Sequence, residues 1–175
     1  MARLPNATVA WQLNLPTPGS ANVAALVGTP MTLKINEWLA RPSGNDEDYF
    51  ELYNPNNQPV ALGGLSLTDF GDPEPHLIPD LSFIGSGPDG FVRFVADNNP
   101  GAGADHVDFR LNADGEQIGL FAANGTQIDV VSFGSQQNGV SEGRFPDGAD
   151  TIERFPGTPT PGASNLRAIT EIVIS

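Results

Sequence analysis

The sequence contains no cysteine among its 175 residues. This absence excludes disulfide bonds, thiolate metal sites and a cysteine nucleophile. It leaves the compartment open, because many exported bacterial domains also lack cysteine.

Basic residues are scarce as well. The chain has 8 of them against 21 acidic residues, which gives a net charge of −13, and Lys34 is its single lysine. Such a surface repels phosphate groups, so we expect no nucleic-acid partner. Anionic membrane surfaces are disfavoured for the same reason.

Long apolar runs are missing too. None approaches the roughly 20 residues that span a bilayer, so we expect no membrane insertion. The start, Met1–Pro5, leads into polar sequence and carries no apolar core of a signal peptide.

Uninterrupted stretches of good helix formers are also absent. Glycine (20) and proline (16) are so spread that the longest interior stretch free of both is 11 residues, at Met31–Arg41 and Ala104–Asp114. A typical helix needs about 11–12 residues plus caps, whereas a strand needs about 5–6. The spacing therefore predicts an all-β chain, a sandwich or barrel.

Several segments alternate or form short apolar runs, as strands do. They are Leu33–Glu37, Phe50–Tyr53, Leu65–Thr68 and Phe91–Ala96. The last is dense in apolar residues around Arg93, which is typical of a central strand.

Asn124-Gly125 is the strongest turn signal. Both residues tolerate positive φ, so the pair predicts a two-residue type I′ hairpin in the middle of a sheet. This loop would place Ala123 opposite Thr126, Phe121 opposite Ile128, Leu120 opposite Asp129, Gly119 opposite Val130, and Ile118 opposite Val131. A second turn at Asn112–Glu116, with Gly115 left-handed, would extend it to a meander over about His106–Phe133.

Two stretches near the ends of the chain repeat each other. Arg3-Leu4-Pro5-Asn6 followed by Pro16–Asn22 corresponds to Arg144-Phe145-Pro146-Asp147 followed by Pro159–Asn165, with Trp11 and Phe155 as the aromatic residues between them. The offsets are 141 and 143 residues, so one gap of two aligns both. Ordered repeats of this kind indicate a tandem array.

The repeat sets the expected domain boundaries. Residues 1–30 would be the tail of a preceding repeat plus a linker, residues 31–165 one β-sandwich, and residues 166–175 the start of a following segment. The span from residue 23 to residue 165 has the size of a common single domain.

An ordered set of motifs within residues 33–165 resembles the bacterial lamin tail domain. The motifs are Ile35-Asn36-Glu37, Phe50–Pro55, Val60–Asp69, Phe109–Leu111, Gly115–Leu120, Gln127–Gly134, Ser141–Gly148 and Thr160–Asn165. Trp38 departs from the family, which usually has an aliphatic residue there, and residues 96–106 look like a family-variable loop.

The resemblance implies an immunoglobulin-like antiparallel β-sandwich without known catalytic machinery. Bacterial modules of this family resemble accessory parts of large exported proteins, so the resemblance implies an extracellular or cell-surface location. The nuclear docking role of the related animal domain is not carried over, because neither the acidity nor the tandem setting suggests it.

Carboxylates on strands are the first candidates for chemistry. Glu51 and Asp129 each lie between apolar neighbours, where a pair could serve as acid and base or could accept hydrogen bonds from a crossing loop. A cleft that joined two of Glu37, Glu51, Asp69 and Asp129, with one desolvated, would favour a hydrolase. The structural role is the expected one, so we predict no catalytic residues.

Other reactive side chains lack the required context. His76 and His106 have no second histidine or cysteine at ligand spacing, which argues against zinc. Ser66 and Ser141 lack a nucleophile elbow.

Acidic loops offer a possible cation site. The loop from Asp97 to Asp105 is rich in glycine and oxygen-bearing side chains, which calcium prefers. Asp97, Asn99 and Asp105 are the candidate calcium ligands, and no other cofactor is expected. Solvated turns explain the same residues through local side-chain to backbone bonds.

The calcium hypothesis predicts a ligand-dependent melting curve. A site held at 100 times its dissociation constant adds about 2.7 kcal/mol of stability. Thermal unfolding in calcium and in chelator measures this difference, and coincident curves would remove the site.

Taken together, these patterns favour a non-catalytic extracellular module, a spacer or adhesion unit of a larger tandem-repeat bacterial surface or secreted protein. Its expected partners are other modules of the same polypeptide and a protein or glycan ligand. A calcium-dependent ligand-binding module and a carboxylate-dependent hydrolase stay open as alternatives.

Overall fold

The computed structural model describes residues 1–3, 11–70 and 74–168. Within them the chain forms short strands joined by turns, and its only helical pieces are two single 3₁₀ turns. The elements are β1 (Ala2–Arg3), β2 (Trp11–Gln12), β3 (Asn14–Leu15), β4 (Val23–Ala24), η1 (Pro30–Thr32), β5 (Lys34–Leu39), β6 (Tyr49–Tyr53), β7 (Val60–Ala61), β8 (Ser66–Thr68), β9 (His76–Leu77), β10 (Phe83–Ile84), η2 (Gly87–Asp89), β11 (Phe91–Val95), β12 (Gly115–Phe121), β13 (Gln127–Gly134), β14 (Val140–Arg144) and β15 (Ile152–Pro156).

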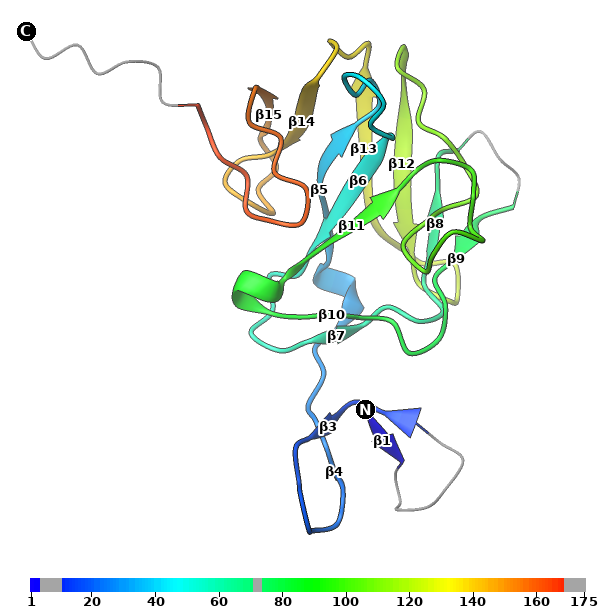
Figure 1. Ribbon diagram of the computed structural model, residues 1–175, viewed down its shortest axis with the longest axis vertical. Helices are drawn as coiled ribbons and strands as arrows, with labels where there is room; N and C mark the ends of the chain where they lie inside the picture. Colours follow the sequence, from blue (N-terminus) through cyan, green and yellow to red (C-terminus); the bar gives the residue numbers. More distant parts are fainter. Residues whose placement is uncertain (4–10, 71–73, 169–175) are drawn as a thin grey trace, which may run out of the picture.

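Two antiparallel sheets pack against each other as a β-sandwich (Figure 1). One sheet has the strand order β11-β6-β5-β14-β15 and the other the order β13-β12-β8-β9. The short pair β7–β10 closes the lower end of the sandwich in this view. The prediction of an all-β sandwich is confirmed. No helix in the described part of the chain has the length and apolar character needed to cross a bilayer.

The core lies between the two sheets. Ile35, Phe50 and Leu52 come from one sheet, Ile118 and Leu120 from the other, and all five are fully buried. Phe50 also stacks on Phe94 and Phe109, with ring centroids 5.5 and 5.9 Å apart. Burying one such aromatic side chain stabilises the fold by about 1.5–3 kcal/mol. Phe109 comes from a loop, so the connection after β11 also contributes to the core.

Two of the strand predictions need correction. Phe91–Val95 forms β11, but this strand lies at the edge of its sheet, and Arg93 is exposed there. Residues 106–111 form only isolated bridges, Val95 with His106 and Asp97 with Arg110, so the expected meander lacks its first strand. The apolar side chains of this segment fill the core from a loop.

The Asn124-Gly125 hairpin has the predicted strands but a different turn. Ile118, Gly119 and Leu120 pair as expected, whereas Phe121 lies opposite Gln127 because the register shifts after Leu120. Only Gly125 has positive φ (80°), and its N–H donates to the carbonyl of Ala122 at 2.8 Å. These features indicate a bulged turn in place of type I′. The hairpin is also not central, because β13 is an edge strand.

The N-terminal strands lie outside the sandwich. β1 pairs with β2 and β3 with β4, and both pairs lie below β7 and β10 (Figure 1). Among the described residues, the buried hydrophobic core begins at Leu33. Residues 4–6 of the repeated motif, and residues 169–175 of the expected following segment, lie outside the described residues.

Candidate functional site

A β-bulge in β5 brings two glutamates face to face. Ile35 pairs with Leu52 and Glu37 with Glu51, so Asn36 is an extra residue on the β5 side. Such a bulge reverses the alternation of side chains beyond it. Ile35 and Trp38 therefore both face the core, and Glu37 joins Glu51 on the opposite face of the sheet.

Both glutamates are completely buried, with no exposed surface. A segment after β15, residues 158–165, contributes donors to both of them; we call it the closing loop. The Glu37 carboxylate accepts hydrogen bonds from Ser141 Oγ (2.5 Å) and from the N–H of Thr160 (3.0 Å to Oε2). Glu51 accepts from the N–H of Gly162 (2.5 Å) and from Asn36 Nδ2 (3.1 Å). The acid pair thus holds the closing loop on the sheet.

Burial raises the pKa values of both carboxyl groups. For Glu51 the desolvation of the charged form outweighs the hydrogen bonds from Asn36 and Gly162, and the neighbouring charge of Glu37 adds to it, so that its pKa rises to about 8. The pKa of Glu37 is raised for the same first cause. Near neutral pH the pair therefore retains a proton, which relieves the repulsion between the two groups.

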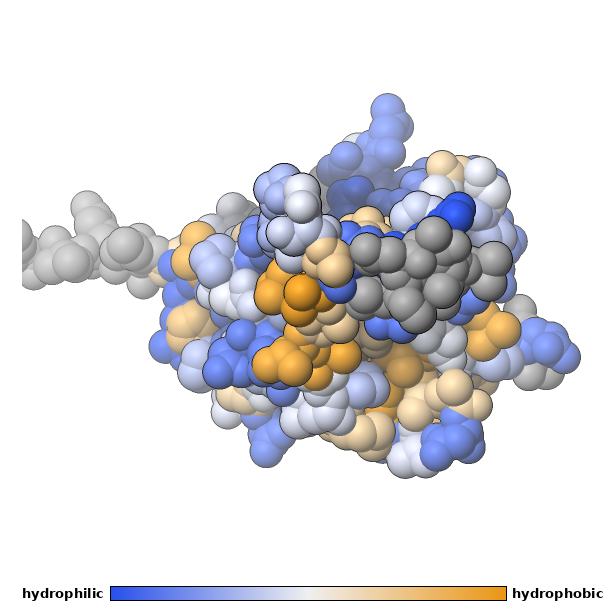
Figure 2. Space-filling view, turned by 90° about the horizontal axis from the view of Figure 1, so that it is seen from below, coloured by the Kyte–Doolittle hydropathy of each residue, from blue (hydrophilic) through white to orange (hydrophobic). Residues whose placement is uncertain are grey.

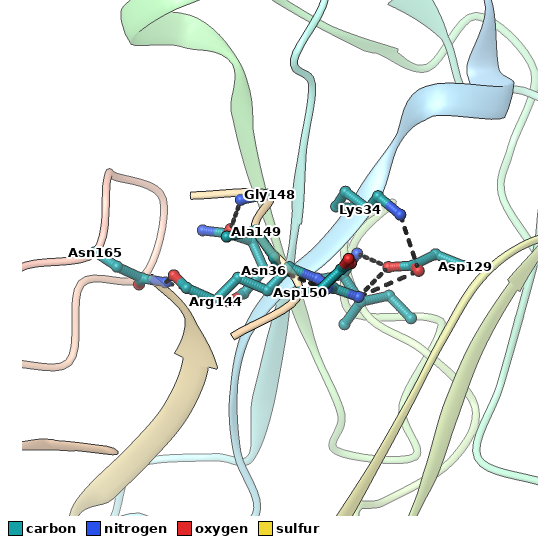
Figure 3. A network of polar contacts seen from close by, with 9 residues as sticks. Lys34, Asn36, Asp129, Arg144, Gly148, Ala149, Asp150 and Asn165 are labelled. Atoms are coloured by element: carbon teal, nitrogen blue, oxygen red, sulfur yellow. Dashed lines mark hydrogen bonds and ion pairs between the residues drawn. The ribbon is translucent and has the colours of Figure 1, made fainter. Parts of the chain in front are cut away.

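A second polar network is centred on Arg144 and Asp129 (Figure 3). Arg144 is buried and donates to both oxygens of Asp129, at 3.2 and 3.0 Å, and to the carbonyl of Ile35 at 2.8 Å. Lys34 reaches Asp129 at 3.5 Å from the solvent side. This network ties β13 to β5 and β14.

Asn165 connects the closing loop to this network. Its Nδ2 donates to the carbonyls of Arg144 (2.8 Å) and Asn36 (3.2 Å). Asn36 in turn accepts from the N–H of Gly148 at 2.9 Å (Figure 3). Asn165 therefore holds the closing loop against β5 and β14.

The arrangement meets only part of the condition set for a hydrolase. Glu37 and Glu51 are close together and desolvated, but the closing loop covers them and neither carboxylate has any exposed surface. Asp129 is engaged separately by Arg144. The interpretation of Glu51 and Asp129 as acceptors for other segments fits these contacts better than acid–base catalysis.

The structure places the predicted calcium ligands in one loop. One oxygen of Asp97 accepts from the N–H of Asn99 at 3.0 Å, and the other lies 2.8 Å from the His106 ring. Among the described residues, no group of three or more histidine, cysteine or acidic side chains is arranged to hold a metal ion. Calcium binding by Asp97, Asn99 and Asp105 stays a prediction.

A cleft of about 650 Å³ lies next to the closing loop. Its lining includes Asp46, Tyr49, Arg93, His106, Pro159 and Pro161. Apolar walls with a few charged groups are typical of a ligand site. No sequence pattern indicated this cleft, because its lining comes from five separate segments.

A family model called Lamin Tail Domain matches residues 28–135. This match covers 108 of the 175 residues and ends before β14, although the larger sheet continues through β14 and β15. The family is one of non-catalytic immunoglobulin-like sandwiches. No curated protein matches the chain. The match covers more than half of the sequence and agrees with the motifs and the sandwich, so the chain belongs to the lamin tail domain family.

Proposed function

We propose that this chain is a non-catalytic extracellular module that serves as a spacer or adhesion unit in a tandem-repeat bacterial surface or secreted protein. Its partners would be neighbouring modules and a protein or glycan ligand. One observation carries the tandem arrangement: residues 1–3 and 11–22 repeat the local structure that closes the sandwich near residue 165.

The two hairpins share their register. Arg3 pairs with Trp11, and Arg144 pairs with Ile152. The partners are eight residues apart in both cases, and the offset of 141 residues is the one that the sequence repeat gives. This register matches Trp11 with Ile152, so the two aromatic residues, Trp11 and Phe155, do not occupy equivalent positions.

The Pro-Thr-Pro-Gly turns that follow are also alike. The N–H of Ser20 donates to the carbonyl of Thr17 at 3.1 Å, and that of Ala163 donates to Thr160 at 2.9 Å. Gly19 and Gly162 both have positive φ, 74° and 85°. Positive φ favours glycine, so the repeated sequence specifies a repeated turn.

The path of the chain supports a spacer. It reaches the sandwich at η1, at the lower end, and leaves along the closing loop at the upper left (Figure 1). Modules joined through such separate points line up in series. The cleft beside the closing loop supports the adhesion role, because loops at one end of a sandwich commonly bind ligands.

Removing residues 1–22 is expected to leave the thermal unfolding midpoint within about 3 °C, which corresponds to about 1 kcal/mol for a domain of this size. The reason is that the core begins at Leu33. Calorimetry of the full chain and of the shortened chain measures the change. A larger fall would mean that these residues belong to the sandwich, and the modular proposal would be wrong.

Once the shortened chain is known to fold, the spacer role can be measured directly. Two copies of residues 23–165 in series should give an X-ray scattering profile whose maximum dimension is about twice that of one copy. A compact particle of scarcely larger dimension would contradict a spacer.

A further inference from the structure

We infer that residues 1–3 and 11–22, which we call the donor segment, form the closing hairpin and loop of a second lamin tail sandwich. The partner is the rest of that second sandwich, which we call the sandwich body. It presents an asparagine and a buried glutamate pair like those on β5 and β6. This inference rests on the proposed tandem arrangement and specifies the chemistry of the contact between modules.

The donor segment carries the groups that close the sandwich in this chain. There, Arg144 binds Asp129, Thr160 and Gly162 donate to the two glutamates, and Asn165 donates to the Asn36 carbonyl. Arg3, Thr17, Gly19 and Asn22 occupy the corresponding positions. The donor segment therefore offers the same set of donors to a partner that supplies acceptors.

The segment is already folded in the shape that docking requires. Asn22 Nδ2 donates to the carbonyl of Arg3 at 3.1 Å, as Asn165 Nδ2 does to Arg144 at 2.8 Å. This bond fixes the turn against the hairpin before any partner arrives. A segment held in its bound shape loses less conformational entropy on binding.

The outward contacts of the two copies differ. Arg144 is paired with Asp129, whereas Arg3 makes no ion pair among the described residues and lies over the Trp11 ring at 5.1 Å. No buried acidic side chain equivalent to Asp129 pairs with Arg3 in the described part of the chain, so such a partner would have to come from another sandwich.

Apolar side chains in and next to the donor segment face solvent. Trp11, Leu15 and Val23 are each about half exposed, and Leu26 and Val27 are also exposed. Figure 2 shows an apolar patch on this lower face of the molecule. A cavity of about 410 Å³ lies between Trp11 and the loop that contains Leu81. The segment thus packs loosely on its own sandwich, and its exposed apolar groups form a surface that a partner could cover.

One position shows that this chain's own sandwich is not the intended partner. Gly143 corresponds to Ala2, and a Cβ atom at Gly143 would lie 2.5 Å from the carbonyl oxygen of Asn36. Such a contact forces the strands apart. The body that accepts the donor segment must therefore leave more room beside its β5 strand, as a different module would.

A graft tests the assignment in the full chain. The sequence Arg3–Asn22 replaces Arg144–Asn165, with Gly143 retained so that the close approach to Asn36 is unchanged. The grafted chain is expected to unfold cooperatively, with a midpoint no more than about 10 °C below that of the unaltered chain. The measurement is thermal unfolding followed by tryptophan fluorescence and circular dichroism.

Two control variants test whether the graft folds through the inferred bonds. Alanine at the grafted equivalents of Arg3, Thr17 and Asn22 should lower the midpoint by at least a further 5 °C or so, because these side chains make the inferred bonds. A graft with the same residues in reversed order should not unfold cooperatively. A true graft that behaves like the reversed one, or that is insensitive to the three alanines, overturns the inference.

The graft and the removal of residues 1–22 together distinguish failure of this inference from failure of the proposed function. If removal of residues 1–22 leaves the midpoint unchanged and the graft fails, the module is autonomous and the partner assignment alone is wrong. If the graft folds and removal of residues 1–22 destabilises the unaltered chain, the donor segment is seated on its own sandwich, and both the inference and the modular proposal are overturned.

Discussion

Replacing Arg144 by alanine is expected to lower the free energy of unfolding by about 3–5 kcal/mol, the usual cost of breaking a buried ion pair by removing one partner. Arg144 has 5% of its surface exposed and donates to Asp129 and to the carbonyls of Ile35 and Ala149. Its loss leaves the Asp129 carboxylate buried, with Lys34 as its remaining cation at 3.5 Å. Urea unfolding, followed by the fluorescence of the buried Trp38, measures the change.

Two further variants test this explanation. Arg110→Ala removes an exposed pair with Glu47, in which the side chains are 60% and 52% exposed, and should cost about 1 kcal/mol or less. Arg144→Met combined with Asp129→Leu should recover part of the loss, because no charge is then left buried. Equal costs for Arg144→Ala and Arg110→Ala would show that the network does not hold the sheets together.

The fold class was predictable because the physical cause is local. Closely spaced glycine and proline limit helix length anywhere in a chain, and the pattern here leaves two 3₁₀ turns in the described residues. The register at Ile118, Gly119 and Leu120 agrees with the prediction although the turn differs, because the shift after Leu120 offsets the change of turn. The repeated turn at Thr17 and Thr160 also follows from its own sequence.

The paired glutamates were not predictable, because the cause is a bulge. Simple alternation puts Leu33, Ile35 and Glu37 on one face, which would place a carboxylate in the core. The bulge at Asn36 turns Glu37 to the opposite face and admits Trp38 to the core. The polarity of Asn36 and Glu37 beside Trp38 was the available signal: it shows that strict alternation cannot continue, though not where it breaks.

The role of the closing loop depends on contacts at long range. Thr160 bonds a residue 123 positions earlier in the chain, and Gly162 one 111 positions earlier. The sequence showed that this loop is repeated, but a repeat does not identify the acceptors. Similarly, the edge position of β11 is decided by the order of strands in the sheet, which the composition of Phe91–Val95 does not determine.

The stability of the protein is expected to fall as the pH rises from about 5 to about 8.5. Burial raises the pKa of Glu51 from 4.5 to about 8, that of Glu116 to about 7 and that of Asp48 to about 6. Each folded-state value exceeds the unfolded one, so the folded state binds more protons in this window and loses stability as they dissociate. Glu51 alone should contribute a loss on the order of a few kcal/mol. Urea unfolding at a series of pH values measures the slope.

Glu51→Gln isolates the largest contribution to that slope. The amide does not titrate, so the fall in stability between pH 5 and 8.5 should become clearly shallower. The quantity to compare is the slope of stability against pH, not the absolute stability. In the variant, the amide NH₂ would face either the Gly162 N–H or Asn36 Nδ2, and two donors facing each other destabilise the fold at every pH. Glu153→Gln is the matched control: the Glu153 side chain is 26% exposed, and its hydrogen bond with Arg167 lowers its pKa, so it is already ionised throughout the window. Equal slopes in Glu51→Gln and the unaltered chain would contradict the raised pKa of Glu51 and mean that this carboxyl is not protonated beneath the closing loop.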